Sequence, residues 1–267
     1  MAQATILVFD SGLGGLTVFR EIAAARPDAT LVYAADDAFF PYGPHSEADL
    51  VARVVPLMGE LIARTAPDLV VIACNTASVQ VLRQLRAHYA VPFVGTVPAI
   101  KPACAASTTK RVAVLGTVAT VRREYTKALI RDFAQGCEVD LVGAARLPAL
   151  AEDALRALPV DDGAIADEIA PCFVDRGGRR TDTVVLACTH FPLLLDRLQR
   201  LAPWPVAWID PAPAIARRVI DLIGPPAPGV RAAPARALFT SGRPVSPALG
   251  AALVRFGIVT EASAPAI

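Results

Sequence analysis

Two stretches of this chain decide its fold: Asp68-Leu-Val-Val-Ile-Ala-Cys74-Asn75-Thr76 and Asp182-Thr-Val-Val-Leu-Ala-Cys188-Thr189-His190. In each, an apolar run rich in β-branched residues ends at a cysteine, and the residues that follow have a helical pattern. Such runs are typical of buried parallel strands, and open α/β sheets bind ligands at the carboxyl ends of those strands. We therefore expect both thiols to end buried strands and to face one pocket.

Strand-like and helix-like segments alternate along the rest of the chain. The expected strands are 5–9, 30–34, 68–73, 91–95, 111–115, 139–143, 183–187, 206–209 and 236–239. The expected helices include the amphipathic segments 47–65, 77–88, 119–134, 161–176, 191–201 and 211–223. This alternation predicts an α/β fold with mostly parallel sheets flanked by helices.

A weak internal repeat indicates two similar lobes. The segment Ile6–Ser11 resembles Val112–Thr117, and proline-rich breaks at 97–102 and 203–213 are typical of crossings between lobes. Any two βα units share some pattern, but the duplicated Ala-Cys endings favour a true repeat. We expect pseudo-twofold related lobes with the active site between them, and domains at 1–97 plus 209–267 and at 98–208.

The composition excludes several classes of protein. The 26 basic and 25 acidic residues nearly balance, and no basic block suggests nucleic-acid binding. No uncharged apolar run reaches the roughly 18 residues that a membrane span needs. Residues 1–10 lack the pattern of a signal peptide, so we expect a cytoplasmic protein.

The cysteines and histidines do not predict a metal site or a disulfide framework. The five cysteines are odd in number and scattered, no CxxC pair occurs, and the chain has three histidines. Cys104, Cys137 and Cys172 are interpreted as small buried apolar residues.

Asp10-Ser-Gly-Leu-Gly-Gly15 follows the first expected strand and has two interpretations. It could bind phosphate at a helix start, but Thr17 replaces the third glycine of the dinucleotide fingerprint and an acidic residue leads the turn. We favour a tight turn that brings backbone amides, Asp10 and Ser11 to a small ligand. Pro41-Tyr42-Gly43 would close over that ligand.

Two matched thiols suggest acid/base chemistry on both sides of one carbon, which is the geometry of a racemase. Asn75-Thr76 and Thr189-His190 supply hydrogen-bonding groups at expected helix starts, where the dipole favours a carboxylate and lowers the pKa of a thiol. His190 is placed to hold or relay the proton of Cys188.

Taken together, the motifs resemble those of glutamate racemases, within the cofactor-independent aspartate/glutamate racemase superfamily. The matching blocks run in family order over essentially the whole chain: Phe9–Thr17, Pro41–Gly43, Ala73–Ala77, Leu115–Thr117, Leu147–Glu152, Ala187–Leu194, Ile209–Asp210 and Thr240–Gly242. Ala35, Pro211 and Arg243 depart from the family pattern, which affects expectations about the pocket edge and the oligomer but not about the chemistry.

The resemblance implies interconversion of L- and D-glutamate, which supplies D-glutamate for peptidoglycan. Carried over by position, Cys74 and Cys188 would be the two bases, with Asp10 assisting Cys74, and His190 with Glu152 assisting Cys188. The residues implied to bind substrate are Asp10, Ser11, Pro41, Tyr42, Gly43, Asn75, Thr76, Thr117, Thr120, Thr189 and His190. A homodimer is expected from the resemblance alone.

No cofactor is expected, because pyridoxal phosphate would need a Schiff-base lysine and Lys101, Lys110 and Lys127 occupy no convincing site. Aspartate racemase is the nearest alternative, since the same thiols could act on a shorter side chain. Hydantoin racemase, a decarboxylase and a two-lobed solute-binding protein fit the paired thiols less well. Some family members also bind DNA gyrase, and the sequence does not decide this.

Overall fold

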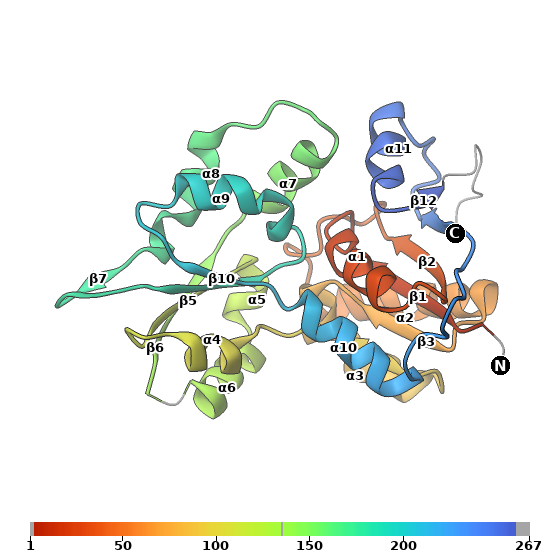
Figure 1. The fold of residues 1–267 in the computed structure, drawn as a ribbon, viewed down its shortest axis with the longest axis horizontal. Helices are drawn as coiled ribbons and strands as arrows, with labels where there is room; N and C mark the ends of the chain where they lie inside the picture. Colours follow the sequence, from red (N-terminus) through yellow and green to blue (C-terminus); the bar gives the residue numbers. More distant parts are fainter. Residues whose placement is uncertain (1–2, 135, 260–267) are drawn as a thin grey trace. The chain divides into compact units, whose positions relative to one another are not determined.

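The computed structural model describes residues 3–134 and 136–259 and divides into two compact units (Figure 1). Unit 1 takes the chain up to Thr96 and from Ala212 onward, and unit 2 is Val97–Pro211. Each unit is a parallel sheet flanked by helices, so the predicted fold class is confirmed. The predicted domains, 1–97 plus 209–267 and 98–208, stay a prediction, with boundaries within three residues of these units.

The sheet of unit 1 has the strand order β12-β11-β2-β1-β3-β4, and all its pairings are parallel. Its strands are β1 (Thr5–Asp10), β2 (Thr30–Ala35), β3 (Leu69–Ile72), β4 (Phe93–Gly95), β11 (Ala235–Phe239) and β12 (Ile258–Val259). The central strands are buried on both faces, as parallel strands with helices on each side must be.

The helices of unit 1 cover both faces of this sheet. They are α1 (Leu16–Ala25), α2 (Glu47–Thr65), α3 (Asn75–His88), α10 (Ala212–Ile223) and α11 (Pro247–Val254). Leu7 and Phe9 of β1 pack with residues of α2 and α3, whereas α1 and α10 contact each other. None of the helices in the described residues is long and apolar enough to span a membrane.

The sheet of unit 2 has the order β10-β9-β5-β6, again parallel throughout. Its strands are β5 (Arg111–Gly116), β6 (Glu138–Gly143), β9 (Thr183–Ala187) and β10 (Ala207–Ile209); β7 (Asp175–Arg176) and β8 (Arg179–Arg180) form a separate antiparallel hairpin. The helices are α4 (Ile100–Ala106), α5 (Val118–Arg122), α6 (Glu124–Phe133), α7 (Leu147–Leu155), α8 (Asp162–Ile169) and α9 (Leu195–Leu201), with 3₁₀ turns η1 (Ala170–Cys172) and η2 (Phe191–Leu194).

The two sheets share one topology, which supports the internal repeat. The order β2-β1-β3-β4 in unit 1 corresponds to β6-β5-β9-β10 in unit 2. Phe9 pairs with Ile72 in the first sheet, and Leu115 pairs with Leu186 in the second. Cys74 and Cys188 therefore stand two residues beyond equivalent register positions. The pseudo-twofold relation of the lobes stays a prediction.

The expected strands are all present, with ends within two residues of those predicted, but three expected helices differ. The segment 119–134 forms two helices, α5 and α6, because the backbone is extended at Arg123. The segment 161–176 leaves the α-helix at Ile169, passes through the proline-containing η1 and enters β7. The segment 191–201 starts as η2 around Pro192, which donates no backbone hydrogen bond.

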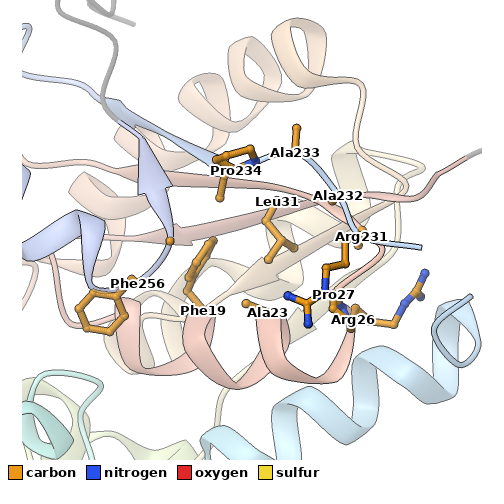
Figure 2. A pocket seen from close by; sticks show the side chains of 13 residues that line it. Phe19, Ala23, Arg26, Pro27, Leu31, Arg231, Ala232, Ala233, Pro234 and Phe256 are labelled. Carbon is orange, nitrogen blue, oxygen red and sulfur yellow. The ribbon is translucent and has the colours of Figure 1, made fainter. Parts of the chain in front are cut away.

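A pocket in unit 1 lies near the amino ends of β2 and β11 (Figure 2). Since the strands of this sheet are parallel, Cys74 lies toward the opposite end of the sheet. Its lining includes the apolar side chains of Phe19 and Leu31 and the guanidinium of Arg26. Nε and Nη2 of Arg26 donate to the two carboxylate oxygens of Asp28 at 2.8 and 2.9 Å.

The Arg26 guanidinium also binds the segment at the end of α10. Nη1 of Arg26 donates to the carbonyl oxygens of Ile223 and Gly224, at the end of α10. Asp28 also accepts from the backbone N–H of Ala227. Hydrogen bonding from Arg26 is the main cause that lowers the pKa of Asp28 from 3.8 to about 2.

We predict that Arg26→Met lowers the free energy of unfolding by about 3 kcal/mol, because it leaves the buried Asp28 carboxylate without its cation. The folded pKa of Asp28 lies below its unfolded value, so its contribution is present above about pH 4 and is lost as the pH falls toward 2. The variant should therefore lose less stability over that range. Urea unfolding at pH 7 and pH 3 measures both effects.

Arg20→Met is the matched control, since Arg20 forms an ion pair with Glu21 that is largely exposed. It should change the unfolding free energy by less than about 0.5 kcal/mol. Equal losses in the two variants would contradict the structural role of Arg26.

Candidate active site

Cys74 lies at the carboxyl end of β3, as predicted. It is the N-cap of α3, and its Sγ accepts from the backbone N–H of Ala77 at 3.5 Å. The same sulfur lies 3.6 Å from Oγ of Ser11, and the Cys74 residue is 6% exposed. The helix start thus places the thiol beside the polar turn that follows β1.

The turn after β1 holds Asp10 in a fixed position. Asp10 is fully buried, and its Oδ1 accepts from the backbone N–H of Gly12 at 2.8 Å. A Cβ at Gly15 would lie 2.7 Å from Cβ of Asp10, so only glycine lets α1 begin this close. The tight turn that we favoured over a dinucleotide-binding loop is therefore present. It places the Asp10 side chain against Gly15, the N-cap of α1.

Tyr42 of the Pro41-Tyr42-Gly43 segment is buried and donates its hydroxyl to Oδ2 of Asp36 at 2.7 Å. Burial, followed by the charge of Asp36, raises the pKa of Tyr42 well above its usual range. The charges of Cys74 and Asp10 contribute in the same direction, which places Tyr42 in their electrostatic environment. Tyr42 is thus held as a neutral hydrogen-bond donor.

Asp36 is the centre of a hydrogen-bond network that fixes this segment. It is fully buried and accepts from Nε and Nη2 of Arg53, at 3.1 and 2.6 Å, and from Oγ1 of Thr240 at 2.7 Å. Its neighbour Asp37 accepts from the backbone N–H of Ser241 at 2.9 Å. The two carboxylates therefore tie the ends of β2 and β11 to the Tyr42 segment.

The side-chain amide of Asn75 is buried and has no hydrogen-bond partner among the described residues. An unsatisfied buried polar group costs about 1–3 kcal/mol, so such a group in a folded protein calls for a partner. Asn75 begins α3 directly after Cys74 and is followed by the buried Thr76. This amide is well placed to meet a polar ligand.

Cys188 follows β9 and is the first of four side chains in unit 2 that are connected by polar contacts. Its Sγ lies 3.7 Å from Nδ1 of His190, and Nε2 of His190 lies 3.2 Å from Oε1 of Glu152 on α7. Oε2 of Glu152 accepts from Nη2 of Arg156, one helical turn further on, at 2.8 Å. Cys188, His190 and Glu152 are each no more than 5% exposed.

Such a chain of thiol, imidazole and carboxylate can store and move a proton. One ring nitrogen of histidine can accept from the thiol while the other donates to the carboxylate, which fixes the tautomer. The Arg156 guanidinium helps to hold Glu152 in place.

The threonines implied by the resemblance lie at the same strand ends. Thr117 caps α5: its Oγ1 accepts from the N–H of Thr120 at 3.2 Å and lies 2.9 Å from Oγ1 of Thr120. Thr189 is buried directly after Cys188. Thr117 corresponds in the repeat to Ser11, so each unit has a hydroxyl residue after its central strand.

The expectation that a helix starts directly after Cys188 is wrong. The segment after His190 is the short 3₁₀ turn η2, and the α-helix begins only at Leu195. The helix-dipole argument for a reactive thiol therefore applies to Cys74 alone, while Cys188 has the imidazole and carboxylate chain instead.

The sequence reasoning assigned no role to Asp36, Arg53, Thr240 or Arg156. The spacing of Glu152 and Arg156, four residues apart on one helix, is a signal that could have found the last of these. Nothing local connects Asp36 to Arg53 or Thr240. Within residues 3–134 and 136–259, no group of three or more His, Cys, Asp or Glu side chains could hold a metal ion.

Comparison with known proteins gives consistent matches. The family model for Asp/Glu/hydantoin racemases matches residues 11–219. A glutamate racemase of Brucella anthropi is 55% identical over 225 residues, or 84% of this chain and 81% of that protein. The crystal structure of Escherichia coli glutamate racemase with L-glutamate and the activator UDP-MurNAc-Ala is 39% identical, with a TM-score of 0.88 over 99% of this chain and 100% of that one.

A third match is the glutamate racemase of Thermus thermophilus in complex with β-chloro-D-alanine, which is 28% identical with a TM-score of 0.74 over 99% of this chain and 97% of that one. The matched sequence spans both cysteine motifs, and the matched folds span both units. The chain belongs to the Asp/Glu/hydantoin racemase family.

Proposed function

We propose that this protein is a glutamate racemase that interconverts L- and D-glutamate with two cysteine bases. The main support for the proposal is that two buried thiols occupy equivalent positions: Cys74 follows β3, and Cys188 follows β9, the corresponding strand of the second sheet. The named activity of relatives that share more than half of their aligned residues with this chain supports glutamate as the substrate.

In this mechanism, the Cys74 thiolate removes the α-proton of D-glutamate, and the Cys188 thiol protonates the opposite face of the same carbon. The product is L-glutamate, with Cys74 protonated and Cys188 as the thiolate. The roles reverse when L-glutamate is the substrate. One proton is taken up and one is delivered, so no net oxidation or reduction occurs.

The groups beside each thiol have different tasks in the proposal. His190, oriented by Glu152, accepts or returns the proton of Cys188 through Nδ1. Asp10 assists Cys74 from the neighbouring strand, and Ser11 hydrogen bonds with the sulfur. Both arrangements let a thiol change its protonation state inside a water-poor site.

The substrate needs electrostatic help, because the Cα–H of an amino acid is a very weak acid. We propose that polar side chains and backbone amides at the strand ends hold its carboxylates and ammonium. The unsatisfied amide of Asn75 supports this most directly. The other proposed binding residues are Asp10, Ser11, Pro41, Tyr42, Gly43, Thr76, Thr117, Thr120, Thr189 and His190.

The cellular role follows from the reaction. We propose that the protein acts in the cytoplasm, as a homodimer, and supplies D-glutamate for peptidoglycan. Its domains in this proposal are 1–97 plus 209–267, which carries Cys74, and 98–208, which carries Cys188. Aspartate racemisation is the alternative substrate choice, and assays with both amino acids distinguish them.

We predict that purified protein racemises glutamate without a cofactor. After exhaustive dialysis and treatment with hydroxylamine, a carbonyl reagent, the rate of circular dichroism change with either enantiomer should stay within about twofold of the untreated rate. Activity that disappears and returns with pyridoxal phosphate would contradict a mechanism that uses the two thiols alone.

We predict that Cys74→Ala and Cys188→Ala each lower kcat for racemisation at least about 100-fold, because each removes one proton-transferring group. Cys172→Ala is the control, since burial, followed by the charge of Asp140, raises the pKa of Cys172 to about 12 and keeps that thiol protonated. It should stay within about twofold of wild type. Near wild-type turnover in either active-site variant, with an intact far-UV spectrum, would remove that cysteine from the mechanism.

We predict that Tyr42→Phe raises KM for glutamate about tenfold, because the Tyr42 segment loses its hydrogen bond to Asp36. Tyr89→Phe is the matched control: its hydroxyl donates at 2.6 Å to the carbonyl oxygen of Val55, between α3 and α2. Both variants should lose about 1–2 kcal/mol of stability. The same KM in both variants would show that Tyr42 has only a stabilising role.

A further inference from the structure

Cys104 and Cys137 bring two thiols together in unit 2. Cys104 lies on α4 and is 5% exposed, whereas Cys137 precedes β6 and is partly buried against the same apolar cluster. The Cys137 thiol donates to the carbonyl oxygen of Cys104, with Sγ and O 3.5 Å apart. Burial, followed by hydrogen bonding with the Cys137 thiol, raises the pKa of Cys104 to about 12.

A cation lies beside this pair. Nζ of Lys110 donates at 3.1 Å to the same Cys104 carbonyl oxygen that accepts from Cys137. The charge of Lys110 lowers the pKa of Cys104, but burial and the hydrogen bond with Cys137 outweigh this effect. Cys137 is partly exposed, so a small reagent can reach its thiol, and the buried Cys104 is its neighbour in the fold.

The backbone around Cys137 leaves room for adjustment. The residue closes a turn in which its N–H donates to the carbonyl oxygen of Ala134. Gly136 in this turn has φ +79° with open space around it. A side chain at Gly136 would contact no neighbouring atom, so Gly136 is not packed against other parts of unit 2.

We propose that Cys104 and Cys137 form a redox-active dithiol, which is oxidised to a reversible disulfide by exchange with a small-molecule disulfide. This site is separate from the proposed racemase thiols. It also revises the interpretation of these two residues as inert apolar side chains.

The exchange balances in two steps. The Cys137 thiolate attacks one sulfur of the reagent, whose S–S bond breaks and releases one thiolate; that group takes up the proton lost by Cys137. Cys104 then attacks the Cys137 sulfur of the mixed disulfide and releases the second half of the reagent, which leaves with the Cys104 proton. Two protein thiols are oxidised, and one small disulfide is reduced to two thiols.

The crosslink joins α4 to the turn before β6 across 33 residues. Closing a loop of that length restricts the unfolded chain, and we expect the oxidised protein to have a Tm about 5 °C above that of the reduced protein. A reducing dithiol should return the Tm to its original value.

The test is to equilibrate the full-length native protein with mixtures of oxidised and reduced glutathione, block free thiols with N-ethylmaleimide and map the cysteines by mass spectrometry. The proposal predicts a peptide pair linked through Cys104 and Cys137, lost again in excess reduced dithiothreitol. Wild-type protein whose Cys104 and Cys137 remain fully alkylated under the most oxidising mixture would overturn it.

Single variants identify the partners. Cys137→Ser should leave Cys104 reduced and abolish the Tm shift, whereas Cys172→Ser should keep both the crosslink and the shift. A disulfide that links either residue to Cys172 instead, or a crosslink that persists in Cys137→Ser, would also overturn the assignment. The cysteine map of the wild-type protein is sufficient to test the proposal, so a variant that folds poorly does not affect the conclusion.

Discussion

The register of the parallel strands is the constraint on which the rest of the site depends. Phe9 pairs with Ile72, and Leu115 pairs with Leu186, so the chain leaves each sheet at equivalent heights and each cysteine follows two residues later. A shift of one residue would turn every side chain of a strand to the other face. Cys74 would then no longer cap α3 beside Ser11, and Cys188 would no longer reach His190.

Two carboxylates, Asp182 and Asp28, fix chain segments that lie next to the starts of strands. Burial alone would raise the pKa of Asp182, but hydrogen bonds from Ser107, Thr108, Thr109 and Thr183 outweigh it and hold that pKa below its usual range. Asp182 connects the segment after α4 to the start of β9 through these hydrogen bonds. In the same way, Arg26 and Asp28 connect the segment after α10 to the residues before β2. These groups are stabilising only with all their donors in place.

The sequence predicted the strands and the position of Cys74 and Cys188 at strand ends, because those signals are local: β-branched apolar runs, and cysteines that follow them. It did not predict β7, β8 or β12, which are two residues long, and it assigned no role to Asp36, whose partner Thr240 is 204 residues away. It also extended regular helix over Pro171 and Pro192, where 3₁₀ turns form. Cys104 and Cys137 looked unrelated in sequence because only the fold of β5 and β6 brings them together.

In the proposed mechanism, two different thiols serve the two faces of one carbon. The most direct measurement is an early-time incubation of D-glutamate in D₂O with the purified protein, in which chiral chromatography separates the two enantiomers and mass spectrometry gives the deuterium content of each. The two-thiol mechanism predicts that the L-glutamate formed first carries solvent deuterium at Cα, while the remaining D-glutamate still carries its original proton. Deuterium appearing equally in both enantiomers from the first turnovers, or L-glutamate that retains the substrate proton, would contradict two separate bases.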